Sequence, residues 1–154
     1  MNGGLNIFAS RPRHRPQLAT RHRGLGRWHV VGESGEPDFE NGWRLEPYGS
    51  AENPQVCFSL DDWGIVHIQS GMLVRDTGSG QTIFTLPAGF RPAQRLSIAC
   101  LGSDTHGRDI DDIPWDAHYR GGRIDITATG HMIADPDAVW LAPPVIRFRR
   151  APST

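Results

Sequence analysis

Residues 82–92 read TIFTLPAGFRP, a short apolar run that stops at a proline. Its apolar side chains are candidates for a hydrophobic core, in which burial of Phe84 or Phe90 would contribute about 1.5–3 kcal/mol each. Pro87 cannot donate a hydrogen bond to a neighbouring strand, and Gly89 permits a positive φ in a turn. The stretch therefore predicts a short β-strand followed by a tight structural corner rather than a catalytic loop.

Glycine and proline interrupt the whole chain in the same way. The 154 residues include 18 glycines and 12 prolines, and the longest stretches free of both are residues 55–63 and 93–101. A globular helix averages about 11–12 residues and resists both residue types in its interior, whereas strands of about 5–6 residues fit this spacing. The spacing excludes a helical bundle and a doubly wound α/β fold, and it predicts a nearly all-β protein.

The runs between these breaks have the length and the alternation of strands. We predict strands over residues 43–46, 56–60, 65–74, 82–86, 94–101, 123–129, 131–134, 139–141 and 145–150. The run 65–74 is expected to form one strand with a bulge at Gly71. In the run 123–129, alternation places Ile126 inward and Asp125 outward. We therefore expect an all-β fold, an antiparallel β-sandwich or jelly-roll-like module with an extended N-terminal arm.

Charge divides the chain into a basic arm and an acidic domain. The sequence has 17 acidic and 16 basic residues, all of the latter arginine, for a net charge of −1. No acidic residue precedes Glu33, whereas six arginines do: Arg11, Arg13, Arg15, Arg21, Arg23 and Arg27. We therefore predict a basic arm over residues 1–32, a sandwich domain over 33–150 and a short tail over 151–154.

The basic arm is too poor in apolar residues to form a core by itself, so its role is expected to be attachment to a partner. Either an acidic protein assembly or a nucleic acid would suit its charge. We favour the protein assembly, because the attached domain is itself acidic and the whole chain lacks the basic field typical of nucleic-acid binders.

Other features limit the setting of the protein. No apolar run approaches the ~18–20 residues of a membrane span, and residues 1–5 lack the pattern of a secretory signal, so we expect no membrane insertion. Cys57 and Cys100 are too few for a disulfide scaffold. Both lie in apolar runs, which favours buried reduced thiols, with a disulfide bridge between them as the alternative.

The polar segment 103–119, SDTHGRDIDDIPWDAHY, is the strongest candidate for ligand binding. The simplest interpretation is a solvated loop. An aromatic ring can also stack on a sugar while carboxylates accept hydroxyl hydrogen bonds, which makes a host-surface glycan a possible ligand. The residues that would bind it are Trp115, Tyr119, Asp111, Asp112 and Asp116. A metal site is a weaker alternative, because the spacing matches no calcium loop, and we expect no metal and no cofactor.

The sequence shows no motif of a catalytic centre. Glycan hydrolysis needs two carboxylates about 5–9.5 Å apart, and nothing in segment 103–119 singles out such a pair. The G-x-S-x-G motif of hydrolases and the phosphate-binding glycine motifs are absent from the sequence. We therefore expect no catalytic residues and a protein that is not an enzyme.

An ordered series of short motifs resembles a known module. The motifs are Asn41-Gly42-Trp43, GIVHI at 64–68, IFTLPAGFRP at 83–92, GRIDI at 122–126, Gly130, VWL at 139–141 and IRF at 146–148. This order resembles the small β-sandwich module at the ends of tail-fibre and minor tail proteins of bacteriophages, including those that infect actinobacteria. The resemblance covers about residues 41–149, with LPAGFRP as its most specific part and segment 102–121 as an unusually long polar departure.

The resemblance implies a non-enzymatic virion protein. It would be a homotrimer, joined to other capsid or tail proteins through residues 1–32, and would act in receptor binding or capsid decoration. Two other hypotheses stay open: a carbohydrate-binding module that is not part of a virion, and a nucleic-acid-binding arm on an inert domain. Binding through arginine–phosphate contacts would fall steeply with salt, which distinguishes the last hypothesis.

Overall fold

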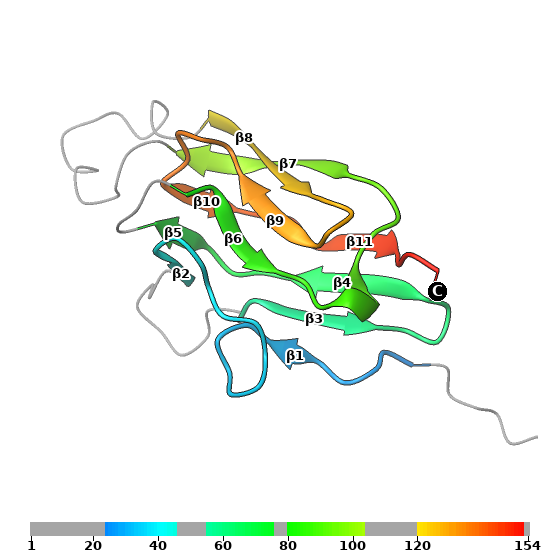
Figure 1. The fold of residues 1–154 in the computed structure, drawn as a ribbon. Coiled ribbons are helices and arrows are strands. Elements are labelled where there is room, and N and C mark those ends of the chain that lie inside the picture. Colours follow the sequence, from blue (N-terminus) through cyan, green and yellow to red (C-terminus); the bar gives the residue numbers. More distant parts are fainter. Residues whose placement is uncertain (1–23, 46–54, 76–79, 104–119, 153–154) are drawn as a thin grey trace, which may run out of the picture.

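The computed structural model describes residues 24–45, 55–75, 80–103 and 120–152, and these form two antiparallel β-sheets (Figure 1). The four-stranded sheet has the order β1 (His29–Val30), β3 (Cys57–Leu60), β4 (Ile65–Gln69) and β11 (Ile146–Arg149). The seven-stranded sheet has the order β2 (Trp43–Leu45), β5 (Leu73–Arg75), β10 (Trp140–Ala142), β7 (Leu96–Ser103), β8 (Arg120–Ile126), β9 (His131–Ala134) and β6 (Thr82–Thr85). The prediction of an antiparallel β-sandwich is confirmed. Among the described residues, no helix is long and apolar enough to span a membrane.

The core lies between the two sheets and is built from alternating strand residues. In β11, Ile146 and Phe148 are buried while Arg147 and Arg149 are exposed, as the alternation predicts. The largest fully buried side chains are Phe58, Phe84, Ile68, Leu73, Ile83, Leu86, Ile124, Ile126, Met132, Leu141, Val56 and Val66. Most come from short runs that the sequence predicts as strands, so burial of their apolar faces accounts for the fold.

The seven-stranded sheet curls until its two edges nearly meet. The backbone amide of Glu40 donates to the carbonyl of Ile83 at 2.8 Å, and the side-chain amide of Asn41 donates to the carbonyl of Thr82 at 3.0 Å. The same segment continues directly into β2, at the other edge of the sheet. The seven-stranded sheet is therefore nearly closed into a barrel. The segment before β2 also covers the β6 edge, which would otherwise expose unpaired backbone groups.

One predicted strand is wrong. Residues 65–74 form two strands in different sheets, because β4 ends at Gln69 in the four-stranded sheet and β5 begins at Leu73 in the seven-stranded sheet. Gly71 therefore lies in the crossing between the sheets and not at a bulge. All three residues of β5 are buried, because this strand lies between β2 and β10. Sequence alternation alone cannot distinguish a bulged strand from a strand that changes sheets.

The corner after β6 is present, but its glycine adopts another conformation than predicted. Residues Ala88–Phe90 form a single 3-10 turn, and Gly89 is not among the glycines with positive φ. The positive φ belongs to Gly130, with φ 94°, in the adjacent β8–β9 turn. A Cβ atom at Gly130 would lie 2.6 Å from the carbonyl oxygen of Leu86. A glycine is therefore required at position 130, where the two turns pack closely, and not at position 89 within the corner.

The last residues of the predicted arm belong to the sandwich. β1 pairs with β3, the amide of Gly26 donates to the carbonyl of Leu60 at 3.0 Å, and Leu25 pairs with Asp61 across an antiparallel bridge. Residues 24–32 thus form an edge of the four-stranded sheet, whereas residues 1–23 lie outside the described residues. The arm prediction missed this edge because a strand of two residues has almost no sequence signal.

The sandwich has two distinct ends (Figure 1). The arm end is defined by Leu25, the turn Asp61–Gly64 and Arg150, whose amide donates to the carbonyl of Gly64 at 3.0 Å. The loop end is defined by the strand ends that flank segments 76–79 and 104–119, together with the turn Asp135–Ala138. The arm sequence therefore joins the domain at the end opposite to the predicted ligand-binding loop.

Candidate functional site

The predicted ligand-binding residues lie outside the described residues. They are Trp115, Tyr119, Asp111, Asp112 and Asp116, all within segment 104–119. Arg11, Arg13, Arg15, Arg21 and Arg23 of the arm also lie outside the described residues. Arg27 is described: its guanidinium lies 3.5 Å from Oε1 of Glu36, and its side chain is largely exposed. The structure therefore describes the residues that flank segment 104–119 but not the segment itself.

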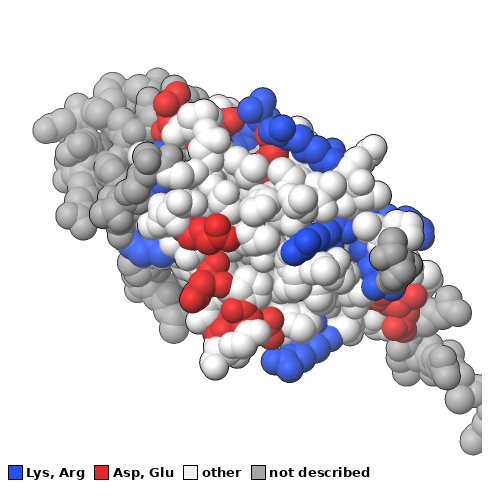
Figure 2. Space-filling model, viewed as in Figure 1, with Lys and Arg blue, Asp and Glu red and all other residues white. Residues whose placement is uncertain are grey.

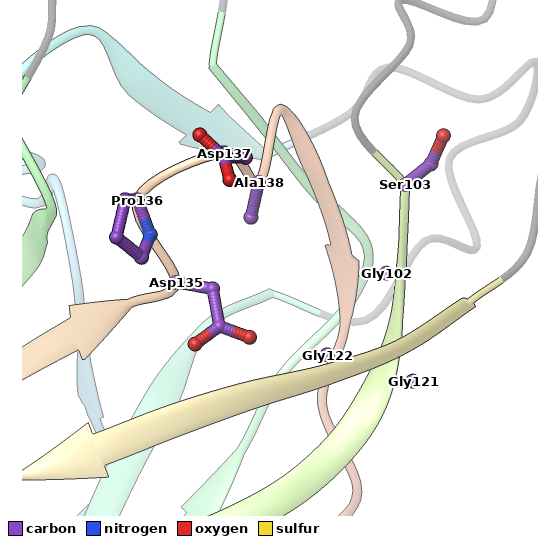
Figure 3. A pocket seen from close by; sticks show the side chains of 8 residues that line it. All are labelled: Gly102, Ser103, Gly121, Gly122, Asp135, Pro136, Asp137 and Ala138. Carbon is purple, nitrogen blue, oxygen red and sulfur yellow. The ribbon is translucent and has the colours of Figure 1, made fainter.

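A hollow of about 260 Å³ lies at the loop end, next to both attachment points of that segment (Figure 3). The residues that line it are Gly102, Ser103, Gly121, Gly122, Asp135, Pro136, Asp137 and Ala138. The turn Asp135–Ala138 faces the ends of β7 and β8 across the hollow (Figure 3). This hollow is the candidate functional site, because residues of the predicted ligand-binding loop connect directly to its wall.

The strand wall of the hollow consists of three glycines and Ser103, so it carries a single side chain. A Cβ atom at Gly121 would meet no heavy atom within 4 Å, so packing does not require a glycine there. At Gly102 and Gly122, a Cβ atom would lie 3.1 and 3.2 Å from Cδ2 of Leu141, so the sheet packs tightly on its core side. The result is a backbone wall that a ligand could approach closely.

The opposite wall is a turn that is held in place from two sides. The amide of Arg123 on β8 donates to Oδ2 of Asp135 at 2.7 Å, and the amide of Ala138 donates to the carbonyl of Asp135 at 3.1 Å. From β5, the guanidinium of Arg75 donates to the carbonyl of Pro136 at 3.2 Å. Asp135 is partly buried and Asp137 is exposed, so the turn offers carboxylate acceptors at the rim of the hollow.

A ladder of alternating charges leads from the outer face of the sheet to this hollow. Asp125 lies on the outer side of β8, as predicted, but it is only 3% exposed because arginine side chains cover it. Arg95 forms a hydrogen-bonded ion pair with it, the Ser97 hydroxyl donates to Oδ1 at 2.5 Å, and Arg123 lies 3.5 Å from Oδ2. Arg123 also reaches Oδ1 of Asp135 at 3.5 Å, which completes the ladder.

This surrounding decides the ionisation of Asp125. Burial by itself would raise the pKa of the carboxyl, but hydrogen bonds from Ser97 and Arg95 and the positive charges of Arg95 and Arg123 lower its pKa below the ordinary value. Asp125 is therefore ionised at neutral pH. It orients Arg123, which in turn fixes Asp135 at the hollow.

The two cysteines are free thiols on different sheets. Burial raises the pKa of Cys57 on β3. Burial, aided by the negative charge of Asp135, raises the pKa of Cys100 on β7 to about 11. Cys100 is therefore protonated at neutral pH and is a poor nucleophile, although it lies close to the hollow.

The chemistry that the hollow offers is hydrogen bonding. Carboxylates accept, and exposed backbone groups donate or accept, so the site suits a hydroxyl-bearing ligand rather than an anion. In the described part of the chain, no three or more His, Cys, Asp or Glu side chains gather in a way that could hold a metal ion. The glycines and aspartates of the site have the composition of ordinary turns, which is why the sequence did not single them out.

Comparisons with family models, with curated proteins and with solved structures found no match to this chain. The resemblance to phage tail-fibre modules stays a prediction from the sequence motifs, of which LPAGFRP is the most specific.

Proposed function

We propose that the protein is a non-enzymatic virion protein of a bacteriophage, attached to the particle by its basic arm. In this proposal it acts as a minor tail, receptor-binding or capsid decoration protein, and three copies assemble around the sandwich. The motif series and the charge division support the proposal, and the sandwich fold agrees with it.

One structural observation carries the proposal, namely the separation of the two ends of the sandwich (Figure 1). The arm sequence joins at Leu25, beside the turn Asp61–Gly64, whereas the hollow and the strand ends next to segment 104–119 lie at the opposite end. A protein attached through one end and presenting a binding site at the other needs this arrangement.

A second candidate function is a carbohydrate-binding module that works without a virion. The hollow favours it, because a glycine wall opposite aspartates lies beside a segment that contains Trp115 and Tyr119. Glycan-array binding by the purified soluble chain, lost in W115A and kept in W63A, would support this candidate. Both variants replace a tryptophan, so the comparison controls for loss of an aromatic side chain.

Deletion of residues 1–23 tests the virion proposal. This truncation is preferable to removal of residues 1–32, because β1 and Gly26 are part of the sandwich. We expect the shortened chain to fold, as circular dichroism would show, and to be absent from particles purified on a density gradient. Incorporation equal to that of the full chain would contradict the proposal. Light scattering after size exclusion measures whether the chain is a trimer.

A further inference from the structure

The arm end exposes apolar side chains that the core does not use. The described residues include four large exposed hydrophobic residues, and two of them belong to this end: Trp63 is 54% exposed and Leu25 is 51% exposed. Leu25 pairs through its backbone with Asp61, two residues before Trp63, so both residues flank the same turn. The chain that precedes Leu25 carries the arm, so the exposed pair lies where the arm meets the domain.

The turn that carries Trp63 is rigidly held. Oδ1 of Asp61 accepts hydrogen bonds from the amides of Trp63 at 2.9 Å and Ile65 at 2.8 Å, and Oδ2 lies 3.0 Å from Nε2 of His67. The amide of Gly64 closes the turn on the carbonyl of Asp61 at 3.0 Å. The backbone at Trp63 is therefore ordered before any partner binds, and an ordered anchor loses little conformational entropy on binding.

The segment that leads into this exposed pair is basic, whereas the described residues around the pair carry both signs of charge. Five arginines and no acidic residue occupy positions 1–23. Asp61 is paired with His67, Asp62 is exposed, and the side chain of Arg150 lies beside Gly64. On the face in Figure 2, the described domain shows acidic and basic groups interspersed, with no large field of one sign. The chain segment that leads into this end is therefore strongly basic in sequence.

We propose that Trp63 and Leu25 form a docking patch that works together with the arm to bind an acidic protein surface with an apolar pocket for the indole ring. This inference rests on the proposed function and names the partner chemistry of its attachment end. Tryptophan is enriched among the residues that contribute most to protein interfaces, whereas exposed charges mainly speed association. The arm guides the chain to the acidic surface, and Trp63 slows its dissociation.

The test measures binding of the full-length chain to purified, nuclease-treated particles by cosedimentation over a series of salt concentrations. We expect W63A to weaken binding at least about tenfold, mainly through faster dissociation, with the salt dependence unchanged. V145A is the matched control, because Val145 is also exposed, at 61%, but lies outside the patch. We expect V145A to bind as the wild type, and W63F to recover part of the lost affinity.

The outcomes separate this inference from the proposed function. If W63A binds as the wild type while the chain without residues 1–23 does not bind, the docking patch is wrong and attachment by the arm stands. If the truncated chain binds as the full chain, the proposed function fails. Binding to free DNA that is stronger than binding to the particles would overturn the acidic protein partner.

Discussion

The arm end and the loop end of the sandwich are built in opposite ways. Further along β1 from the arm end, His29 stacks on Phe58 with ring centroids 5.1 Å apart, Phe90 contacts both rings edge-on, and Nδ1 of His29 lies 2.9 Å from Glu36. At the loop end, three glycines and Ser103 form one wall of a hollow. In the proposed function, the ordered arm end serves attachment, and the hollow leaves space for a ligand at the loop end.

The largest expected effect is on the aromatic cluster beside β1. Phe58 is fully buried and also stacks on Phe84, with ring centroids 6.4 Å apart. F58A should lower the free energy of unfolding by about 3–5 kcal/mol, because it removes buried surface and leaves a cavity. Urea denaturation measures this loss. A loss below about 1 kcal/mol would mean that this cluster is not a rigid part of the core.

A matched pair of glycine substitutions compares the two ends directly. A Cβ atom at Gly26 would lie 2.5 Å from the carbonyl oxygen of Leu60, whereas one at Gly121 would meet nothing within 4 Å. G26A should destabilise the protein by about 1–3 kcal/mol through overpacking, while G121A should stay within about 1 kcal/mol of the wild type. Thermal denaturation of both variants measures the difference. Equal losses of stability in G26A and G121A would contradict the structural contrast between the two ends.

The charge ladder between the ends should give stability a pH dependence. D125N should cost about 1–3 kcal/mol at neutral pH, because it removes an acceptor from Ser97 and the arginines. The pKa of Asp125 is lowered in the folded protein, so its contribution is complete above the unfolded pKa of about 3.9 and is lost as pH falls through the folded pKa. The difference between D125N and wild type should therefore shrink in acid. Denaturation at pH 7 and pH 3 tests this, and a constant difference would contradict the assignment.

The smallest effect concerns thiol reactivity. Because the pKa of Cys100 is about 11, its reaction with a disulfide reagent at pH 8 should be about tenfold or more slower than that of free cysteine. D135N removes a charge that raises this pKa, so Cys100 should react faster in that variant while Cys57, on the other sheet, should not change. Mass spectrometry of the labelled peptides distinguishes the two thiols. An unchanged reaction rate at Cys100 in D135N would mean that the charge of Asp135 does not act on this thiol.

The sequence predicted the fold class because glycine and proline spacing leaves no room for helices. It also predicted most strands, since alternation such as that of residues 146–149 follows directly from one buried face. The sequence-based prediction failed where three-dimensional packing decides the path and the conformation of the chain. The chain changes sheets after Gln69, and the glycine with positive φ is Gly130 rather than Gly89.

The candidate site could be predicted only in part. The polar segment 103–119 pointed to the loop end, and the hollow lies beside its attachment points. Asp135 could not be recognised, because its position depends on Arg123 and Asp125 of β8 and on Arg95, which directly precedes β7. Trp63 belongs to no motif that the sequence analysis singles out, and only its exposure in the folded chain indicates a binding role.

The central claim is that the arm end faces the particle and the loop end faces outward. Two exposed residues report on these ends, Asp62 in the turn at the arm end and Asp137 at the rim of the hollow. In particles that carry D62C or D137C, we expect a maleimide reagent to label position 137 readily and position 62 poorly, whereas both should react in the free protein. Equal labelling of the two positions on particles, or protection of position 137 instead, would contradict the account.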